Sequence, residues 1–462
     1  MERHGRRKRG NNMIITIVGG GSTFTPGIVK SIALRQKELE VEEVRLFDID
    51  EERQYKVSLV VDWILKDMKS PIRLTVTTDK KTAYENSSFI FAQMRVGKYA
   101  MREKDEKIPL RHGCVGQETC GCGGLAYGLR TLFPMIQVID DVEKYAAPDH
   151  WILNYSNPAA VVSEACRALR PHARIINICD MPIAILEMVG RCLDIPNFTD
   201  FDVNYFGLNH FGWFTDITYQ GRDLKAEITE YVMKNKTLLP PDVLVEKLKE
   251  HDRVGERHLN ASWIHTWNNV YKVLQSNPEY LPNTYLQYYL LSKDVVEESN
   301  PEYTRANEVM DSREKELFEG IDHYIKTGEV TAKAFYHGAH GNYIADLAMA
   351  LKNDTKKKFI VIVQNNGAIE NIAPDAMVEV PAYIGKNGPE VICQGPIGDY
   401  YKGLMEQQLA SEKLLVAGGI EGSYEKVWKA FSMNKTVPSA TVAKAILDEM
   451  IEANKEFWPE LR

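Results

Sequence analysis

Cys179 and Asp180 are adjacent side chains whose chemistry could be catalytic. A thiolate can bind a soft or borderline divalent metal, and a carboxyl can carry a proton to or from a substrate. His210 lies further along the chain in an aromatic, glycine-bearing segment. A cysteine with a histidine suits a transition metal. For these side chains the alternative is a small buried thiol, a helix N-cap and an ordinary core histidine, since buried free cysteines are common.

The strands predicted before Cys179 and before Asn157 indicate where Cys179 and Asp180 lie in the fold. Residues 173–176 form an apolar run that predicts a buried parallel strand ending just before Cys179. A second predicted strand, 151–153, runs into Asn157. In an open α/β sheet, ligands bind at the carboxyl ends of the strands. We therefore expect Asn157 and Cys179 to lie together at that edge.

The N-terminal segment predicts a dinucleotide site. Residues 13–18 are rich in β-branched side chains and predict a buried strand, and residues 26–34 predict a helix. The turn between strand and helix can cradle a pyrophosphate, and its candidate contacts are Gly19, Gly21, Ser22 and Thr23. The match to the G-x-G-x-x-G pattern is incomplete, because Phe24 stands at the third glycine.

Asp48 follows the next predicted strand, 44–47. An acid at this position normally binds the adenosine ribose hydroxyls and selects NAD over NADP. A predicted helix over 51–68 and strands over 74–76 and 89–92 complete a βαβαβ unit, and right-handed crossovers make this unit part of a doubly wound sheet. The predicted fold class is α/β, a Rossmann-like parallel sheet followed by a helix-rich α+β domain for substrate binding and oligomerisation. The predicted boundaries are a basic extension over 1–12, the NAD-binding domain over 13–203 and the second domain over 204–462.

Other candidate residues have ordinary alternatives. Arg95 follows the strand predicted at 89–92, and Arg305 lies in a helix-like segment. Either arginine could grip an anionic substrate or be a surface charge. Glu118 lies in a glycine-rich stretch, 116–124, that predicts a loop near a ligand. Tyr285 belongs to a tyrosine cluster whose simpler reading is a packed aromatic patch.

Composition narrows the class of protein. The 462 residues are 44% hydrophobic and 26% charged, as in ordinary globular proteins. The net charge of −8 argues against nucleic acid or an anionic membrane as the main partner. No apolar run reaches the roughly 20 residues of a membrane helix. The seven scattered cysteines do not suggest a disulfide framework and point to a reducing cytoplasm.

Taken together, these motifs resemble the NAD- and Mn-dependent glycosidases of glycoside hydrolase family 4, from Met13 to Leu461. Segments 177–182 and 283–289 are similar to those of the members that act on 6-phospho-α-glucosides, whereas β-specific members typically carry asparagine at the position of Asp180. The basic extension and Cys122 depart from the family pattern. The resemblance is carried by Gly19-Gly20-Gly21-Ser22-Thr23-Phe24-Thr25-Pro26, Arg95-Val96-Gly97, Gly116-Gln117-Glu118-Thr119, Ser156-Asn157-Pro158, Cys179-Asp180-Met181-Pro182, Gly207-Leu208-Asn209-His210 and Asn283-Thr284-Tyr285.

The resemblance implies a redox-assisted elimination, which the usual two-carboxylate mechanism of glycosidases does not include. Its steps are oxidation at C3, deprotonation at C2, loss of the leaving group, water addition at C1 and re-reduction at C3. It implies NAD, Mn²⁺ or another divalent metal, a phosphorylated disaccharide such as maltose 6′-phosphate, and a homodimer or homotetramer. The implied roles are Cys179 and His210 as metal ligands, Tyr285 as base, Asp180 as general acid, and Arg95, Asn157 and Arg305 as sugar-phosphate contacts.

Three alternatives remain at this stage. A 6-phospho-β-glucosidase of the same family would share nearly all the motifs. An NAD-dependent dehydrogenase of a 2-hydroxy acid would fit the Rossmann half and Asn157, but it would not need a cysteine–histidine metal pair or a tyrosine base. An NAD-binding redox sensor would share the fold and lack the hydrolysis.

Overall fold

The protein is described by a computed structural model covering residues 13–251, 261–338 and 341–462. The predicted basic extension over 1–12 lies outside these residues. A nine-stranded sheet organises the chain, in the order β13-β12-β11-β6-β5-β4-β1-β2-β3. Six of its strands are mutually parallel, which confirms the predicted Rossmann-like sheet. They are β1 (Met13–Val18), β2 (Val41–Phe47), β3 (Arg73–Thr77), β4 (Phe89–Ala92), β5 (Trp151–Asn154) and β6 (Ile175–Asn177).

Four of these strands end at the same level. The pairing register places Val18 of β1 beside Ala92 of β4, Ala92 beside Asn154 of β5, and Asn154 beside Asn177 of β6. The Asn154 side chain also donates a 2.8 Å hydrogen bond to the Asn177 side chain. The four loops that follow therefore leave the sheet side by side, at the edge where ligands bind in α/β folds.

Three strands from the C-terminal half complete the sheet. These antiparallel strands are β11 (Lys357–Gln364), β12 (Met377–Gly385) and β13 (Gly388–Val391), and β11 pairs with β6. Only the first of them is marked in the sequence by a clear run of apolar, β-branched residues, at 359–363. The domain boundary at residue 203 stays a prediction, but the large sheet crosses it.

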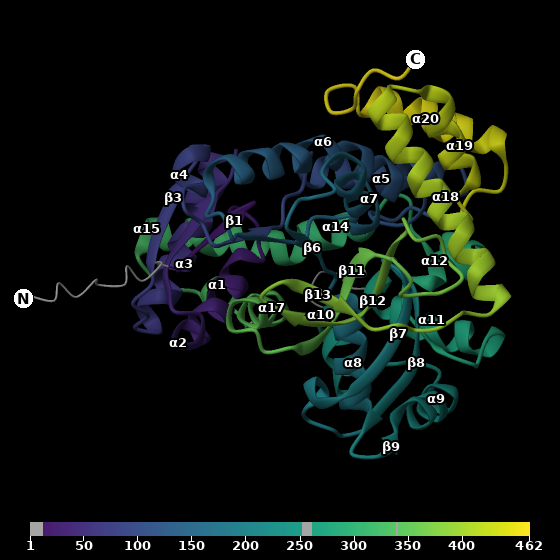
Figure 1. Cartoon of the computed structure of the whole chain (residues 1–462), viewed down its shortest axis with the longest axis horizontal. Helices are drawn as coiled ribbons and strands as arrows, with labels where there is room; N and C mark the ends of the chain where they lie inside the picture. The colour runs from purple at the N-terminus through teal and green to yellow at the C-terminus, as the bar shows by residue number, and fades with distance from the viewer. Residues whose placement is uncertain (1–12, 252–260, 339–340) are drawn as a thin grey trace, which may run out of the picture.

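Helices cover both faces of the sheet (Figure 1). Ile15 and Ile17 of β1 pack with α1 (Thr25–Leu34), α3 (Glu51–Asp67), α15 (Lys315–Thr327) and α17 (Asn342–Asn353). Val18 packs on the other face with α6 (Gly121–Tyr145), α7 (Ala159–Leu169) and the C-terminal helices α18 (Asp399–Glu421), α19 (Tyr424–Met433) and α20 (Ala440–Ala453). The loop predicted over 116–124 is shorter than expected, because α6 begins at Gly121.

A smaller antiparallel sheet lies against the large one. Its strands are β7 (Asp202–Leu208), β8 (Phe211–Tyr219), β9 (Arg222–Asp223) and β10 (Leu281–Pro282). Their apolar side chains pack against α8 (Met181–Cys192), α9 (Leu224–Asn235), α10 (Pro241–His251) and α11 (Ala261–Ser276). The two helices α9 and α10 are separate, and α10 begins at the second residue of the Pro240-Pro241 pair.

The carboxyl of Glu412 makes the stability of this fold depend on pH. It lies buried in α18, where burial raises its pKa from 4.5 to about 8, against a hydrogen bond from Gln408. A carboxyl whose pKa rises on folding holds its proton more tightly in the native state, so stability falls as pH rises from 4.5 through 8. Glu412→Gln should raise the melting temperature by several degrees at pH 9 and change it little at pH 4.

Thermal unfolding of both proteins at the two pH values measures this effect. Glu406→Gln on the same helix is the control, because Glu406 is half exposed and pairs with Lys402. An equal difference between the Glu412→Gln variant and the parent protein at both pH values would contradict the assignment.

Candidate functional site

A cavity of about 1360 Å³ opens at the carboxyl edge of the parallel strands. All the site residues predicted from the sequence line this one cavity, although they come from eight separate segments of the chain. They are Gly19, Gly21, Ser22, Thr23, Asp48, Arg95, Asn157, Cys179, Asp180, His210, Tyr285 and Arg305. The structure thus brings the predicted residues together; their individual roles stay predictions.

Cys179 and Asp180 occupy the short connection between β6 and α8. The backbone N–H of Met181 donates to Cys179 Sγ at 3.5 Å. Asp180 stands at the N-cap position of α8, but its side chain makes no capping hydrogen bond. Asp180 is exposed to the cavity, whereas only 8% of Cys179 is exposed. The carboxyl therefore does not serve the helix-capping role that was its alternative explanation.

His210 lies in the tight turn between β7 and β8. Leu208 and Phe211 are paired across this turn, and His210 adopts a left-handed backbone conformation with φ of 63°. Such a conformation costs about 1–3 kcal/mol in a residue other than glycine. It directs Nε2 of His210 to within 3.2 Å of Cys179 Sγ. The predicted cysteine–histidine pair is thus formed, with the histidine in a turn instead of the expected strand.

The environment of this pair fits a divalent metal. Burial lowers the pKa of His210 to about 3, so its imidazole is neutral and has a lone pair to donate. Burial, with Glu379 and Asp180 nearby, raises the pKa of the Cys179 thiol, so a metal must displace its proton. Asn209 Oδ1 is buried without a hydrogen-bond partner in the described residues. No group of three or more His, Cys, Asp or Glu side chains gathers within the described ranges, so a metal held here would keep coordination positions open for a substrate.

Tyr285 lies directly beside the pair. Its ring meets the His210 ring edge-on, with centroids 4.5 Å apart, and its backbone N–H donates to Asn283 Oδ1 at 3.0 Å. Burial raises the pKa of the Tyr285 phenol well above 10, and the neighbouring Tyr288 and Glu118 add to this effect. Tyr285 can act as a base only when a cation nearby lowers that pKa. A metal on Cys179 and His210 would be such a cation.

The glycine turn at the other end of the cavity fits a dinucleotide. Gly19 has φ of +83°, and a Cβ there would come 2.9 Å from the Gln93 carbonyl oxygen. The Asp48 carboxylate accepts a 2.8 Å hydrogen bond from the Gly21 N–H and a 3.0 Å bond from the Asp50 N–H. The predicted ribose-binding acid therefore also fixes the turn. Bare backbone at this turn leaves room for a pyrophosphate.

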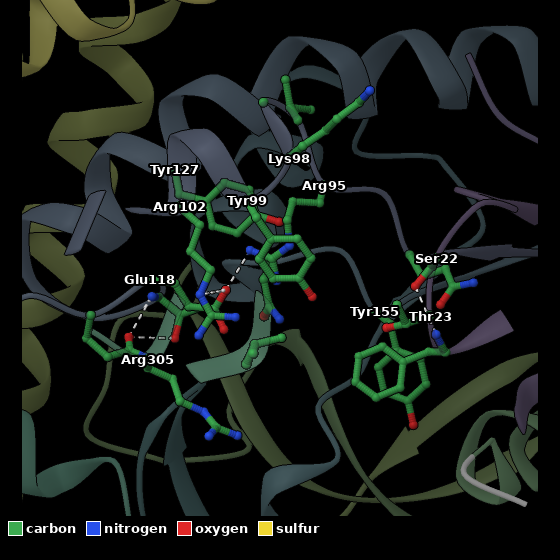
Figure 2. Close-up of a pocket in the computed structure, with 18 of the residues that line it drawn as sticks. Ser22, Thr23, Arg95, Lys98, Tyr99, Arg102, Glu118, Tyr127, Tyr155 and Arg305 are labelled. Carbon is green, nitrogen blue, oxygen red and sulfur yellow. Dashed lines mark hydrogen bonds and ion pairs between the residues drawn. The ribbon is translucent and has the colours of Figure 1, made fainter. Parts of the chain in front are cut away.

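A charged cluster forms the wall opposite the glycine turn. Figure 2 shows Arg95 and Arg102 pointing toward the Glu118 carboxylate, at 2.6 and 3.3 Å, with Ser22 and Thr23 across the pocket. Burial alone would raise the pKa of Glu118, but Arg102 and Arg95 outweigh burial and lower it to about 2. Arg102 is only 5% exposed, so its charge is buried in this cluster.

Arg305 reaches the cavity from the first residue of α14 (Arg305–Val309). Its Nη1 donates at 2.8 Å to Glu308 Oε2, and 31% of its side chain remains exposed. In Figure 2 it lies on the same side of the pocket as Glu118. A half-buried guanidinium in this position suits an anionic group of a ligand.

Sequence reasoning missed several buried residues around the site. Glu379 on β12 accepts hydrogen bonds from Tyr205 Oη at 3.0 Å and from Asn209 Nδ2 at 3.2 Å, and burial raises its pKa to about 7. The Asn283 side chain donates to Tyr205 Oη at 3.2 Å. One carboxyl thus connects the turn of His210 with the turn of Tyr285. No local sequence pattern marks Glu379, because its partners are about 170 residues away in the chain.

The dinucleotide-binding turn and the cysteine–histidine pair at one sheet edge define a cofactor-dependent enzyme of the α/β class. The family 4 glycosyl hydrolase model matches residues 14–195, and the C-terminal domain model of the same family matches residues 205–437. The chain belongs to the family 4 glycosyl hydrolases. This result excludes the hydroxy-acid dehydrogenase and the redox sensor as readings of the chain.

Three relatives are similar over almost the whole length. A 6-phospho-α-glucosidase of Leptotrichia buccalis is 48% identical over 97% of this chain and 99% of its own. A crystal structure of a 6-phospho-α-glucosidase from gut microorganisms with NAD and glucose 6-phosphate has a TM-score of 0.92 and 46% identity, covering 98% of this chain and all of that one. A second such structure, with NAD and Mn²⁺, has a TM-score of 0.90 and 42% identity over the same shares.

Among the residues that the structure describes, no helix has the length and apolar composition needed to cross a membrane.

Proposed function

We propose that this chain hydrolyses 6-phospho-α-glucosides such as maltose 6′-phosphate, using NAD and Mn²⁺ or another divalent metal. The observation that carries the proposal is the Cys179–His210 pair, 3.2 Å apart and in ring contact with Tyr285, in the cavity that the glycine turn also lines. The relatives with NAD, Mn²⁺ and glucose 6-phosphate support the same reading. Asp180 supports α specificity, since it can place an acid on that face of the sugar.

The cofactors and the chain contribute different parts of this reaction. When bound, NAD supplies reversible hydride acceptance at C3, and the metal supplies positive charge beside the C2 and C3 oxygens. Tyr285 removes the proton from C2, which the C3 ketone has made acidic. Asp180 donates a proton to the departing glycosidic oxygen. Arg305 binds the 6-phosphate through its planar fork of donors, while Arg95 and Asn157 hold the sugar.

We also propose the compartment in which the enzyme acts and its oligomeric state. Five of the seven cysteines are buried and none forms a disulfide, which favours the reducing cytoplasm as the site of action. A homo-oligomer, either dimer or tetramer, remains our prediction from the resemblance. Sedimentation of the purified chain would determine its oligomeric state.

Solvent isotope exchange tests the elimination route. When maltose 6′-phosphate is cleaved in D₂O with NAD and Mn²⁺, the glucose 6-phosphate released should carry deuterium at C2, because the proton taken by Tyr285 exchanges with solvent. Omitting either cofactor should abolish both cleavage and exchange. Mass spectrometry and proton NMR of the product measure the label.

Two comparisons complete this test. An aryl 6-phospho-β-glucoside serves as the anomeric control, and its cleavage at the same rate as the α anomer would contradict the α assignment. Product without deuterium at C2 would show direct displacement at C1. Net accumulation of NADH during turnover would also contradict the proposal, because the hydride must return to C3.

A further inference from the structure

We propose that Glu308 is a positioning residue that aims the guanidinium of Arg305 at the phosphate of the substrate. This inference rests on the proposed function, in which Arg305 binds the 6-phosphate. Glu308 is only 4% exposed and lies one helical turn after Arg305 in α14. Its carboxylate therefore lies behind the arginine, in the wall of the cavity.

The Glu308 carboxylate is held from two sides. Oε2 accepts a 2.8 Å hydrogen bond from Arg305 Nη1 and a 2.6 Å bond from Ser262 Oγ, and Oε1 accepts a 3.1 Å bond from the Ser262 N–H. Ser262 belongs to α11, so the carboxylate is fixed by an element other than its own helix. Both carboxylate oxygens are thus engaged, and Glu308 cannot turn without breaking bonds to α11.

A fixed carboxylate constrains the arginine as a whole. The guanidinium is planar, with five N–H donors in a rigid fork, so holding Nη1 restricts the direction of the other donors. Without this contact, the guanidinium of a side chain that is 31% exposed would be less restricted in direction, and ordering it on binding would reduce the affinity. Because Glu308 already orders the arginine in the folded protein, less side-chain freedom is lost when the ligand binds.

A second buried carboxylate, that of Glu106, contacts the first turn of α14. Its Oε2 accepts a 2.7 Å hydrogen bond from the Ala306 N–H, and its Oε1 accepts a 2.8 Å bond from Arg102 Nε. Arg102 in turn contacts Glu118. These contacts therefore fix the position of the first turn of α14 relative to the charged cluster that contains Arg95. The backbone of Ala306, next to Arg305, and the guanidinium of Arg305 are thus each held by a buried carboxylate.

The sign of one mutant effect separates positioning from simple charge. If Glu308 acted only through its negative charge, Glu308→Gln would tighten the binding of a phosphate dianion. Positioning predicts the reverse, because glutamine has one accepting oxygen in place of two and cannot accept from Arg305 and from the Ser262 N–H at once. In the protein loaded with NAD and Mn²⁺, we expect the Kd of glucose 6-phosphate and the KM of maltose 6′-phosphate to rise about tenfold, with kcat changed less than about twofold. Tighter or unchanged glucose 6-phosphate binding would overturn the proposal.

Two further variants of this contact keep the test decisive. Glu308→Asp retains the charge but withdraws the carboxylate, and should give an intermediate rise in Kd. Ser262→Ala removes one of the bonds that hold the carboxylate, and should raise Kd in the same direction by about threefold. If Glu308→Gln does not fold, these two variants decide, and unchanged binding in both would overturn the proposal.

A matched pair elsewhere in the chain provides the control. Glu164 is 5% exposed and binds Arg167 three residues away on α7, with the same spacing as the Arg305–Glu308 pair, but it does not line the cavity. Glu164→Gln should leave the Kd of glucose 6-phosphate unchanged. An equal rise in both glutamine variants would point to a general loss of stability and overturn the positioning role.

Arg305→Ala separates this inference from the proposed function. We expect it to reduce the preference for glucose 6-phosphate over glucose by roughly 100-fold, since a charge-assisted bidentate contact is lost. If this preference is unchanged in Arg305→Ala, the phosphate role of Arg305 itself is wrong. If Arg305→Ala removes the preference and Glu308→Gln does not affect it, only the positioning role fails.

Discussion

Asp180→Asn should slow cleavage of maltose 6′-phosphate by at least about 100-fold and slow cleavage of p-nitrophenyl 6-phospho-α-glucoside far less. General acid catalysis contributes roughly 10²–10⁴ to a rate when the leaving group is a poor one. A sugar hydroxyl needs a proton as it leaves, whereas p-nitrophenolate is stable without one. Asparagine preserves the shape of the side chain and removes only the proton.

The structure makes this substitution a clean one. Asp180 does not cap α8, so the helix should keep its stability in the variant. Steady-state kinetics with the two substrates give the ratio of effects, and deuterium exchange at C2 reports whether the earlier proton removal is intact. Exchange should persist in the variant. An equal loss of rate on both substrates would exclude the general-acid role.

Cys179→Ser should produce the second large effect, a loss of Mn²⁺ affinity of at least about 100-fold with a parallel loss of activity. A serine hydroxyl is a much weaker ligand than a thiolate for a borderline metal. Electron paramagnetic resonance of free Mn²⁺ measures binding directly, without any turnover. Excess Mn²⁺ should restore only part of the activity.

An exposed thiol provides the comparison. Cys393 is exposed and does not line the cavity, and Cys393→Ser should bind Mn²⁺ as the parent chain does. Chelation by EDTA should inactivate the parent protein, and added Mn²⁺ should restore it. Full activity of the parent chain in EDTA would rule out the metal role of Cys179 and His210.

The sequence predicted the half of the site that follows directly from the strands. Apolar runs located the β1, β4, β5 and β6 strands, and parallel strands must end at a common edge. Gly19, Asn157 and Cys179 could therefore be placed together before any coordinates were known. His210 had no such positional signal, and its residue type alone suggested a metal site with Cys179. The roles of Tyr285 and Arg305 were expected only from the resemblance.

The residues that support the site could not be predicted. Glu308, Glu106 and Glu379 lie in ordinary-looking segments, and each acts through partners 46 to 200 residues away. The strands β12 and β13 were also missed. The burial of a single carboxylate depends on packing between distant segments, and neither periodicity nor composition records that packing.

The two halves of the pocket differ in the secondary structure that supports them. The glycine turn, Asn157 and Cys179 emerge from three of the strands whose ends are level, β1, β5 and β6. Tyr285 stands at the start of α12 (Leu286–Leu290), a helix of five residues, whereas Arg305 stands at the start of α14, which continues through residues 310–314 into α15. A helix as short as α12 opens at a lower free energy than core strands. Sugar entry and product departure can therefore proceed by small excursions of the segment that carries Tyr285, while the glycine turn and Cys179 stay in place.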